Sequence, residues 1–207
     1  MMFTLTEEEY RRRAKPELMK IFLDTNSHAP IFGSNVEKVK LIYKYFPPNL
    51  ELINALIDSA SNLGDSSLYL SIVNIVSTDT SVTKNWEIPF DKISAYLSAD
   101  IDSSGMAYQL ENVIYSPQGK WALLYTFEKY GVLAGCEQFI DDFSRKFPDI
   151  DRQILDYLGL FQECINSEGI GRVNTTWLGS FLKTVYGLNK ARKLLEKTSL
   201  EEYVNIF

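Results

Sequence analysis

The sequence predicts an α+β fold in which helices precede and follow a small antiparallel sheet. Apolar residues recur at helical spacing near both ends of the chain, whereas turn residues separate two apolar runs near its centre. With 207 residues, of which 45% are hydrophobic, the chain can bury a sizeable core. No Gly/Ser/Pro-rich linker divides it, so we expect one domain over residues 1–207, with a helical subdomain at 1–65 as the alternative.

The N-terminal part is predicted to be helical. Thr6 and Glu9 have the spacing of a capping box, which begins a first helix. Ser34 is a good N-cap for another helix, whose apolar side would consist of Val36, Val39, Tyr43 and Phe46. After two prolines, Asn49 would cap a third, with apolar positions Leu52, Ile53, Leu56, Ile57 and Ala60. The tight link between the last two predicts a helical hairpin.

The central part is predicted to contain the sheet. Residues 68–76 (LYLSIVNIV) are rich in β-branched side chains, which favours a strand, although four of them also fit one helical face. A short helix is expected at Asp91–Leu97. The apolar runs Tyr108–Tyr115 and Trp121–Phe127 flank the turn sequence Ser-Pro-Gln-Gly, so they predict an antiparallel hairpin.

Helices are predicted again in the C-terminal part. The glycine-containing segment Tyr130–Gly135 is interpreted as the turn that leads into a helix with Phe139, Ile140, Phe143 and Phe147 on its apolar side. A second helix is expected over Ile150–Ile165. A third would begin at Thr175 or Thr176 and end at Gly187, before a basic final helix over Asn189–Lys197.

The charge of the chain is unevenly distributed. Its net charge is −6, and residues 91–163 contain twelve acids and six bases. This acidic middle argues against a nucleic-acid partner and would suit a basic protein or a bound cation, or serve as a solvated surface. The first 25 residues lack the apolar stretch of a signal peptide, and no apolar run reaches the ~20 residues that span a bilayer, so we expect a cytoplasmic protein without membrane contact.

Residues typical of catalytic or metal sites are scarce. The chain has one histidine, His28, and two separated cysteines, Cys136 and Cys164, which we expect to be free thiols. No nucleophile motif or phosphate-binding loop is present. Asp141 and Asp142 would point in different directions on a helix, which makes them poor partners for one substrate. We therefore predict no catalytic residue and no cofactor.

One segment matches a metal-binding motif in part. Residues 100–111 read DIDSSGMAYQLE, and an EF-hand loop needs oxygen donors at positions 1, 3, 5, 7 and 12 with glycine at position 6. The residues at these positions are Asp100, Asp102, Ser104, Met106, Glu111 and Gly105. Position 8 is alanine, the chain has no second loop, and the following segment favours a strand, so a polar turn is the competing interpretation. Calcium binding by this loop is kept as an alternative.

Residues 116–143 read SPQGKWALLYTFEKYGVLAGCEQFIDDF. A Ser-Pro-x-Gly turn leads into a strand that begins with tryptophan, and a Tyr-Gly turn leads into an acidic amphipathic helix. This stretch, Ser116–Phe143, resembles segments of immunity proteins from bacterial contact-dependent inhibition and polymorphic-toxin systems. The resemblance carries no functional residue over to this chain. It implies a small, acidic, cytoplasmic protein that binds and blocks a toxin domain.

Three functions are consistent with these observations. The first is a non-catalytic protein-binding module, an immunity or inhibitor protein whose partner is another protein such as a basic toxin domain. The second is a calcium-binding domain that uses Asp100–Glu111. The third is a carboxylate-dependent enzyme of unknown reaction. We favour the first, because acidic and tyrosine-rich surfaces can recognise basic partners.

Overall fold

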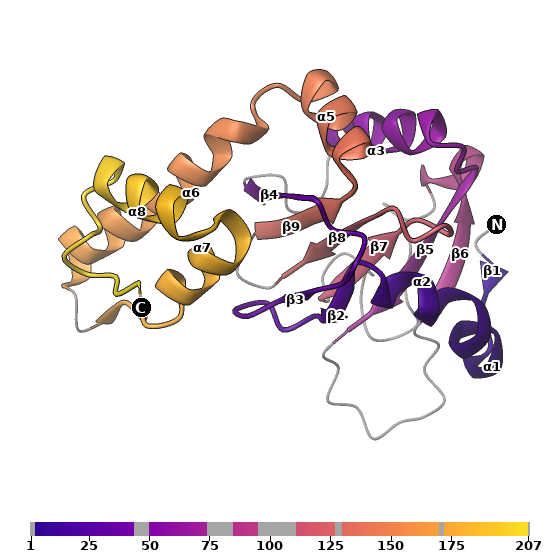
Figure 1. Cartoon of the computed structure of the whole chain (residues 1–207), viewed down its shortest axis with the longest axis horizontal. Coiled ribbons are helices and arrows are strands. Elements are labelled where there is room, and N and C mark those ends of the chain that lie inside the picture. The colour runs from indigo at the N-terminus through magenta and orange to yellow at the C-terminus, as the bar shows by residue number, and fades with distance from the viewer. Residues whose placement is uncertain are drawn as a thin grey trace.

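The computed structural model describes residues 3–43, 50–73, 85–94, 111–126, 130–169 and 172–206. Within these residues, seven strands form an antiparallel sheet in the order β1-β6-β5-β7-β8-β9-β4, and a second sheet contains β2 and β3. Helices cover both faces of the large sheet (Figure 1). The predicted mixture of helices with an antiparallel sheet, an α+β fold, is therefore confirmed.

The strands of the large sheet come from most of the chain. Their bounds are Phe3–Thr4 (β1), Lys38–Tyr43 (β4), Ser67–Ile72 (β5), Asn85–Pro89 (β6), Asn112–Tyr115 (β7), Trp121–Tyr125 (β8) and Tyr130–Gly135 (β9). The strand interpretation of residues 68–76 is confirmed by β5 as far as Ile72, and residues 74–76 lie outside the described residues. The predicted central hairpin is confirmed by β7 and β8, in which Tyr115 pairs with Ala122.

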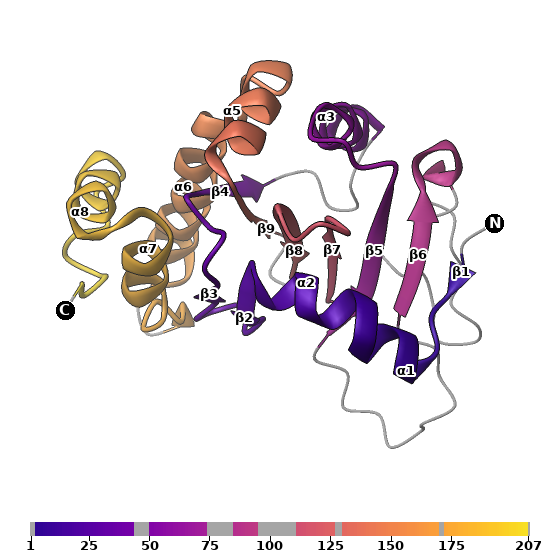
Figure 2. The ribbon, with the colours of Figure 1, turned by 45° about the vertical axis from the view of Figure 1, so that its right-hand side comes forward.

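A helical segment at the N-terminus lies across one face of the sheet, and two other helices lie across the opposite face (Figure 2). The first segment contains α1 (Glu7–Glu9), a π-helical turn (Tyr10–Ala14) and α2 (Lys15–Met19), and the small hairpin β2 (Phe22–Asp24) and β3 (Ile31–Phe32) follows it. Its predicted capping box is present, because the Glu9 amide donates to Thr6 Oγ1 (3.2 Å) and the Thr6 amide donates to Glu9 Oε2 (2.9 Å). The opposite face is covered by α3 (Leu50–Asn62) and α5 (Glu137–Lys146).

Two sequence predictions are wrong, and both concern partners in one strand pair. The predicted helix after Ser34 is instead strand β4 over Lys38–Tyr43, so the N-terminal helical hairpin does not form, although its second helix is confirmed as α3. The segment 130–135, interpreted as a turn, is strand β9. Each β4 residue from Lys38 to Tyr43 pairs with a β9 residue from Gly135 back to Tyr130. Such a pairing between distant segments overrides local helical spacing.

Gly135 shows why β9 can carry glycines. A Cβ built at this position would lie 2.6 Å from the Lys120 carbonyl oxygen and 2.9 Å from Trp121 Cα. Only a residue without a side chain fits there, so the glycine permits close packing between strands rather than a turn.

The core beneath α3 and α5 contains a buried polar network. The Trp121 ring stacks on Phe139 with centroids 5.0 Å apart. Its indole Nε1–H donates to Asp65 Oδ2 (2.9 Å), and Gln118 Nε2 donates to Asp65 Oδ1 (2.7 Å). Asp65 is 6% exposed. This carboxylate therefore ties the segment after α3 to the turn between β7 and β8.

A second polar link joins α5 to α3. The Asp142 carboxylate accepts from Lys146 Nζ (2.7 Å), Asn62 Nδ2 (2.9 Å) and Arg145 (2.9 Å). These donors, Lys146 first, hold the pKa of Asp142 well below the usual range of an aspartate. The helix pair is therefore linked through a carboxylate that stays ionised at neutral pH.

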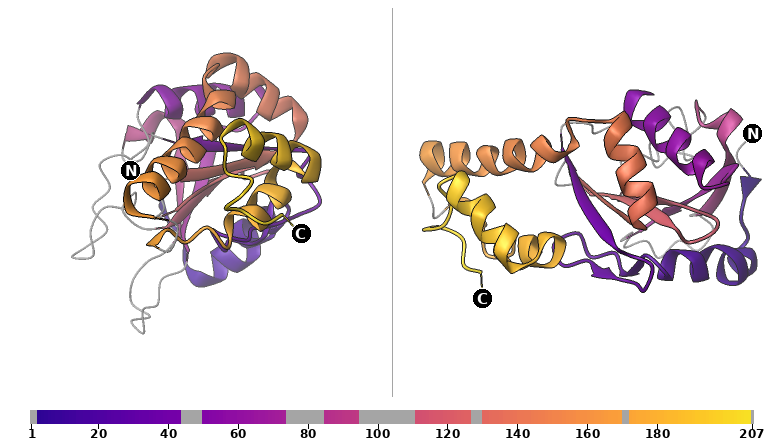
Figure 3. Two further views of the ribbon diagram at one scale, coloured as in Figure 1. Left: turned by 90° about the vertical axis from the view of Figure 1, so that its left-hand side faces the viewer. Right: turned by 45° about the horizontal axis from the view of Figure 1, so that its top comes forward.

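The C-terminal helices gather at the β4 end of the sheet (Figure 3). They are α6 (Ile150–Glu168), α7 (Leu178–Tyr186) and α8 (Leu188–Lys197), and they confirm the three helices predicted there. The chain then returns over α7, where the carbonyl oxygen of Asn205 lies directly against Gly179. Among the described residues, no helix is both long and apolar enough to cross a bilayer.

Candidate functional site

Strand β4 is the last strand of the sheet, and two side chains from the C-terminal helices bond to its outer edge. The Leu41 amide donates to the Tyr186 hydroxyl oxygen (3.1 Å), and the Tyr43 amide donates to Gln153 Oε1 (2.6 Å). Burial raises the pKa of the Tyr186 hydroxyl, which stays protonated at neutral pH. Because these amides are occupied, another strand cannot pair with this part of the edge.

A groove runs between β4 and α8, above this occupied edge. It consists of two adjoining hollows of about 290 and 450 Å³ that share Lys40 and Lys190. Apolar side chains from three helices line it, namely Ile154, Leu155, Val185 and Leu194. Five lysines also line it, two from β4 and three from α8: Lys38, Lys40, Lys190, Lys193 and Lys197. We call this feature the lysine groove.

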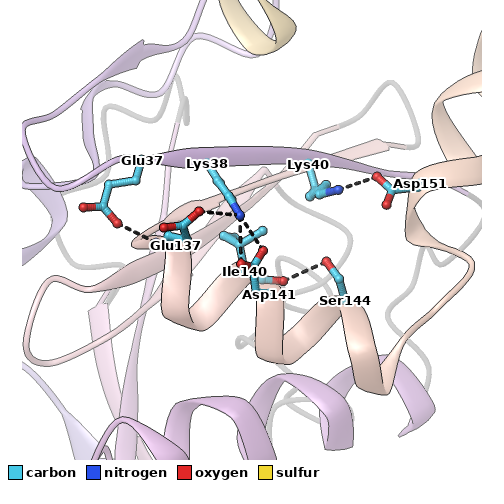
Figure 4. A network of polar contacts seen from close by, with 8 residues as sticks. All are labelled: Glu37, Lys38, Lys40, Glu137, Ile140, Asp141, Ser144 and Asp151. Atoms are coloured by element: carbon cyan, nitrogen blue, oxygen red, sulfur yellow. Dashed lines mark hydrogen bonds and ion pairs between the residues drawn. The ribbon is translucent and has the colours of Figure 1, made fainter.

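The two β4 lysines of the groove are paired with acids (Figure 4). Lys38 Nζ lies 2.7 Å from Asp141 Oδ1 and 2.7 Å from Glu137 Oε1, both on α5. These carboxylates, Asp141 first, raise the pKa of Lys38. Lys40 pairs with Asp151 at the start of α6. The positive charge of this wall is therefore balanced within the chain.

The network also fixes the start of α5. The Glu137 amide, at the first residue of this helix, donates to Glu37 Oε2 (2.7 Å), just before β4. About two turns later, Ser144 Oγ donates to the Ile140 carbonyl oxygen (2.7 Å). The helix that supplies acids to the groove is thus anchored to the strand that supplies its lysines (Figure 4).

The three α8 lysines lack such partners. Lys190, Lys193 and Lys197 are exposed and, within the part of the chain that the structure describes, none of them forms an ion pair. Their spacing of three and four residues places them on one side of the helix, in a row about 10 Å long at ~1.5 Å per residue. Lys190 Nζ also lies 4.8 Å from the centre of the Tyr186 ring. The α8 wall of the lysine groove is therefore positively charged.

Several acids of the acidic middle segment are paired with basic side chains of the same chain. Of the twelve acids between residues 91 and 163, five form ion pairs with lysine or arginine within the described residues: Asp91, Glu137, Asp141, Asp142 and Asp151. A carboxylate held by a lysine contributes little negative potential at the surface. The acidic composition of this segment therefore does not translate directly into an acidic face.

The calcium loop predicted from the sequence falls almost wholly outside the described residues. Asp100, Asp102, Ser104 and Met106 lie there, and only Glu111 is described, as a buried residue immediately before β7. Among the described residues, no three His, Cys, Asp or Glu side chains form a group that could hold a metal ion. Calcium binding by residues 100–111 stays a prediction.

Of the remaining residues considered from the sequence, Asp141 lines the groove, and the others are not among its lining residues. His28 stands in the β2–β3 loop, half-buried, with its ring stacked on Trp177 at 4.3 Å between centroids. Cys136 and Cys164 are half-buried free cysteines. Asp141 and Asp142 do point to different partners, Lys38 and Lys146 respectively, as helical geometry predicts.

Neither a protein-family model nor a curated protein nor a solved structure matches this chain. Its function must therefore be inferred from its own residues. Sequence reasoning missed the lysine groove, because one wall lies on the strand that was predicted to be a helix. The only signal was the basic final helix, whose three lysines share one side.

Proposed function

We propose that the chain is a non-catalytic protein-binding module, an immunity or inhibitor protein of bacteria that binds and neutralises a toxin domain in the cytoplasm. The observation that carries this proposal is the lysine groove, in which an apolar floor lies beside a row of exposed cations. Protein interfaces combine these properties, since apolar contacts stabilise a complex and charges select and orient the partner.

The segment that resembles immunity proteins contributes to this groove. Ser116–Phe143 includes β8, β9 and most of α5. Strand β9 holds β4 in the sheet, and α5 supplies Asp141 to the groove and Glu137 as a partner of Lys38. The resemblance and the groove therefore concern the same region of the fold, which supports one functional interpretation of both.

The overall charge supports the same class of partner. A net charge of −6 attracts a basic toxin domain over long range, which raises the rate of association. The groove adds a local site of the opposite sign. A partner that is basic overall but presents an acidic segment satisfies both features.

The experiment is co-expression in bacteria. Each protein encoded by a neighbouring gene is tested as the candidate toxin: it is induced with and without the chain, growth is followed, and the purified proteins are mixed and separated by size. Restored growth together with a stable complex supports the proposal. Continued toxicity without a complex contradicts it, as does turnover of a small substrate that is abolished when a buried acid is replaced by its amide.

A further inference from the structure

We propose that the lysine groove binds an acidic segment of the partner protein, whose carboxylates lie along the α8 row of Lys190, Lys193 and Lys197. This inference rests on the proposed function, because it names the part of the partner that the protein-binding module recognises. Like charges held in a row on one helix repel one another, and a bound row of carboxylates removes that repulsion. The helix is thus arranged for an anionic ligand.

The dimensions of the row define the segment. Lys190 and Lys197 are separated by seven residues of helix, or about 10 Å. An extended polypeptide covers this distance with roughly four residues at ~3.3 Å each. Since side chains of an extended chain alternate in direction, acids at every second position would face α8 while the intervening side chains face the floor. The apolar floor, with Leu155 and Leu194, then favours hydrophobic residues at those intervening positions.

On the β4 wall of the groove, a carboxylate of the partner protein can replace Asp151 as the ion-pair partner of Lys40. Lys40 is held against the protein, with a side chain 17% exposed, whereas its partner Asp151 is 65% exposed. An incoming carboxylate can therefore take the place of Asp151 beside Lys40 without moving the lysine. The exposed ion pair is worth little in water, so its replacement costs little.

A polypeptide fits this groove better than a nucleic acid. A phosphate backbone presents one charge at every nucleotide and would meet Asp141 and Asp151, which also line the groove. The net charge of −6 opposes the approach of a long polyanion, while a short acidic segment within a basic domain is not repelled in this way. The apolar floor also has no counterpart in a phosphate backbone.

The test uses a fluorescent peptide of alternating glutamate and leucine, and fluorescence anisotropy with the full chain. The triple variant Lys190→Glu, Lys193→Glu, Lys197→Glu should weaken binding by about tenfold or more, because favourable charge pairs between the peptide and these lysines become repulsive. The matched control Arg12→Glu, Lys15→Glu, Lys92→Glu changes the net charge equally at exposed sites on the π-helical turn, α2 and the segment after β6. It should change affinity by less than about twofold, since these sites lie away from the groove.

Four further measurements make the outcome decisive. The peptide with glutamine in place of glutamate should not bind, and binding of the glutamate peptide should weaken as NaCl rises from about 0.05 to about 0.5 M. Circular dichroism establishes that the variants fold, and the milder set Lys190→Gln, Lys193→Gln, Lys197→Gln should give an intermediate loss. Equal losses in the groove and control triple variants, or displacement of the peptide by single-stranded DNA, would overturn the inference.

The co-expression assay separates this inference from the proposed function. If the groove triple variant still neutralises the toxin domain, the module binds through another surface, so the inference fails while the proposed function stands. If the peptide binds in the groove but the unaltered chain neutralises no toxin domain, the proposed function fails and recognition of acidic segments stands.

Discussion

Replacing the buried Asp65 by alanine should destabilise the fold by about 3 kcal/mol. Asp65 is 6% exposed, and it accepts hydrogen bonds from Trp121 Nε1 at 2.9 Å and Gln118 Nε2 at 2.7 Å. Hydrogen bonds to a charged group contribute about 1.5–3 kcal/mol each, and a buried donor left without an acceptor costs about 1–3 kcal/mol. The loss is less than the sum, because the alanine variant no longer buries a charge.

The assay is urea unfolding followed by circular dichroism, with a double-mutant cycle for the hydrogen-bonded pair. Asp65→Ala, Trp121→Phe and the double variant are compared with the unaltered chain. Residues in one buried network are coupled, so we expect a coupling free energy of about 1–2 kcal/mol. The single Asp65 variant should also lower Tm by about 8 °C, at roughly 2–4 °C per kcal/mol for a chain of this size.

The control is Asp58→Ala, an exposed acid on helix α3, which precedes Asp65 in the chain. An exposed residue without such a network should change the free energy of unfolding by less than about 0.5 kcal/mol. The reasoning is refuted if Asp65→Ala costs less than about 1 kcal/mol, or if its effect is the same with and without the Trp121 indole N–H.

Three other changes test the groove and its supports. Tyr186→Phe leaves an edge amide of β4 without its acceptor, so urea unfolding should show a loss of about 1–2 kcal/mol, and an unchanged midpoint would contradict the edge contact. Gly179→Ala forces a Cβ into the space of the Asn205 carbonyl, so we expect a lower Tm and faster proteolysis of the C-terminal segment. An unchanged Tm and an unchanged rate of proteolysis would show that this segment does not pack against α7. Asp142→Asn should cost about 1.5 kcal/mol near pH 7. Lys146 lowers the folded pKa of Asp142 below 3.8, so the contribution of the Asp142 carboxylate to stability is complete above that value and is lost as pH falls. The difference in stability between the variant and the unaltered chain should therefore vanish in acid. A difference that stays constant with pH would argue against the ion pair.

The sequence was sufficient for elements whose signals are local. Helices α3, α5, α6, α7 and α8 each carry an apolar side at helical spacing, and the capping box of Thr6 and Glu9 is a contact between neighbours in sequence. The β7–β8 hairpin was likewise indicated by its own turn residues. In these elements the stabilising contacts are between residues close in sequence, so the spacing of apolar residues and the local propensities are sufficient to predict them.

The failures have a common physical cause. The spacing of Val36, Val39 and Tyr43 suits one side of a helix, but Val39 and Tyr43 also lie on one side of β4, with Leu41 between them. Which spacing prevails depends on β9, far along the chain, and not on β4 itself. The groove could not be predicted for the same reason, since it exists only after this strand pair brings Lys38 and Lys40 near α8.

The pairing of β4 with β9 also orders events during protein synthesis. About 90 residues separate Tyr43 from its partner Tyr130, a delay of roughly ten seconds at ~10 residues per second. Throughout this delay the nascent β4 has no partner on either side, and its outer edge is closed only when the ribosome has released Gln153 and Tyr186. The lysine groove is thus assembled last, and a chain whose translation stops before α7 displays an unprotected β-edge on which aggregation can start.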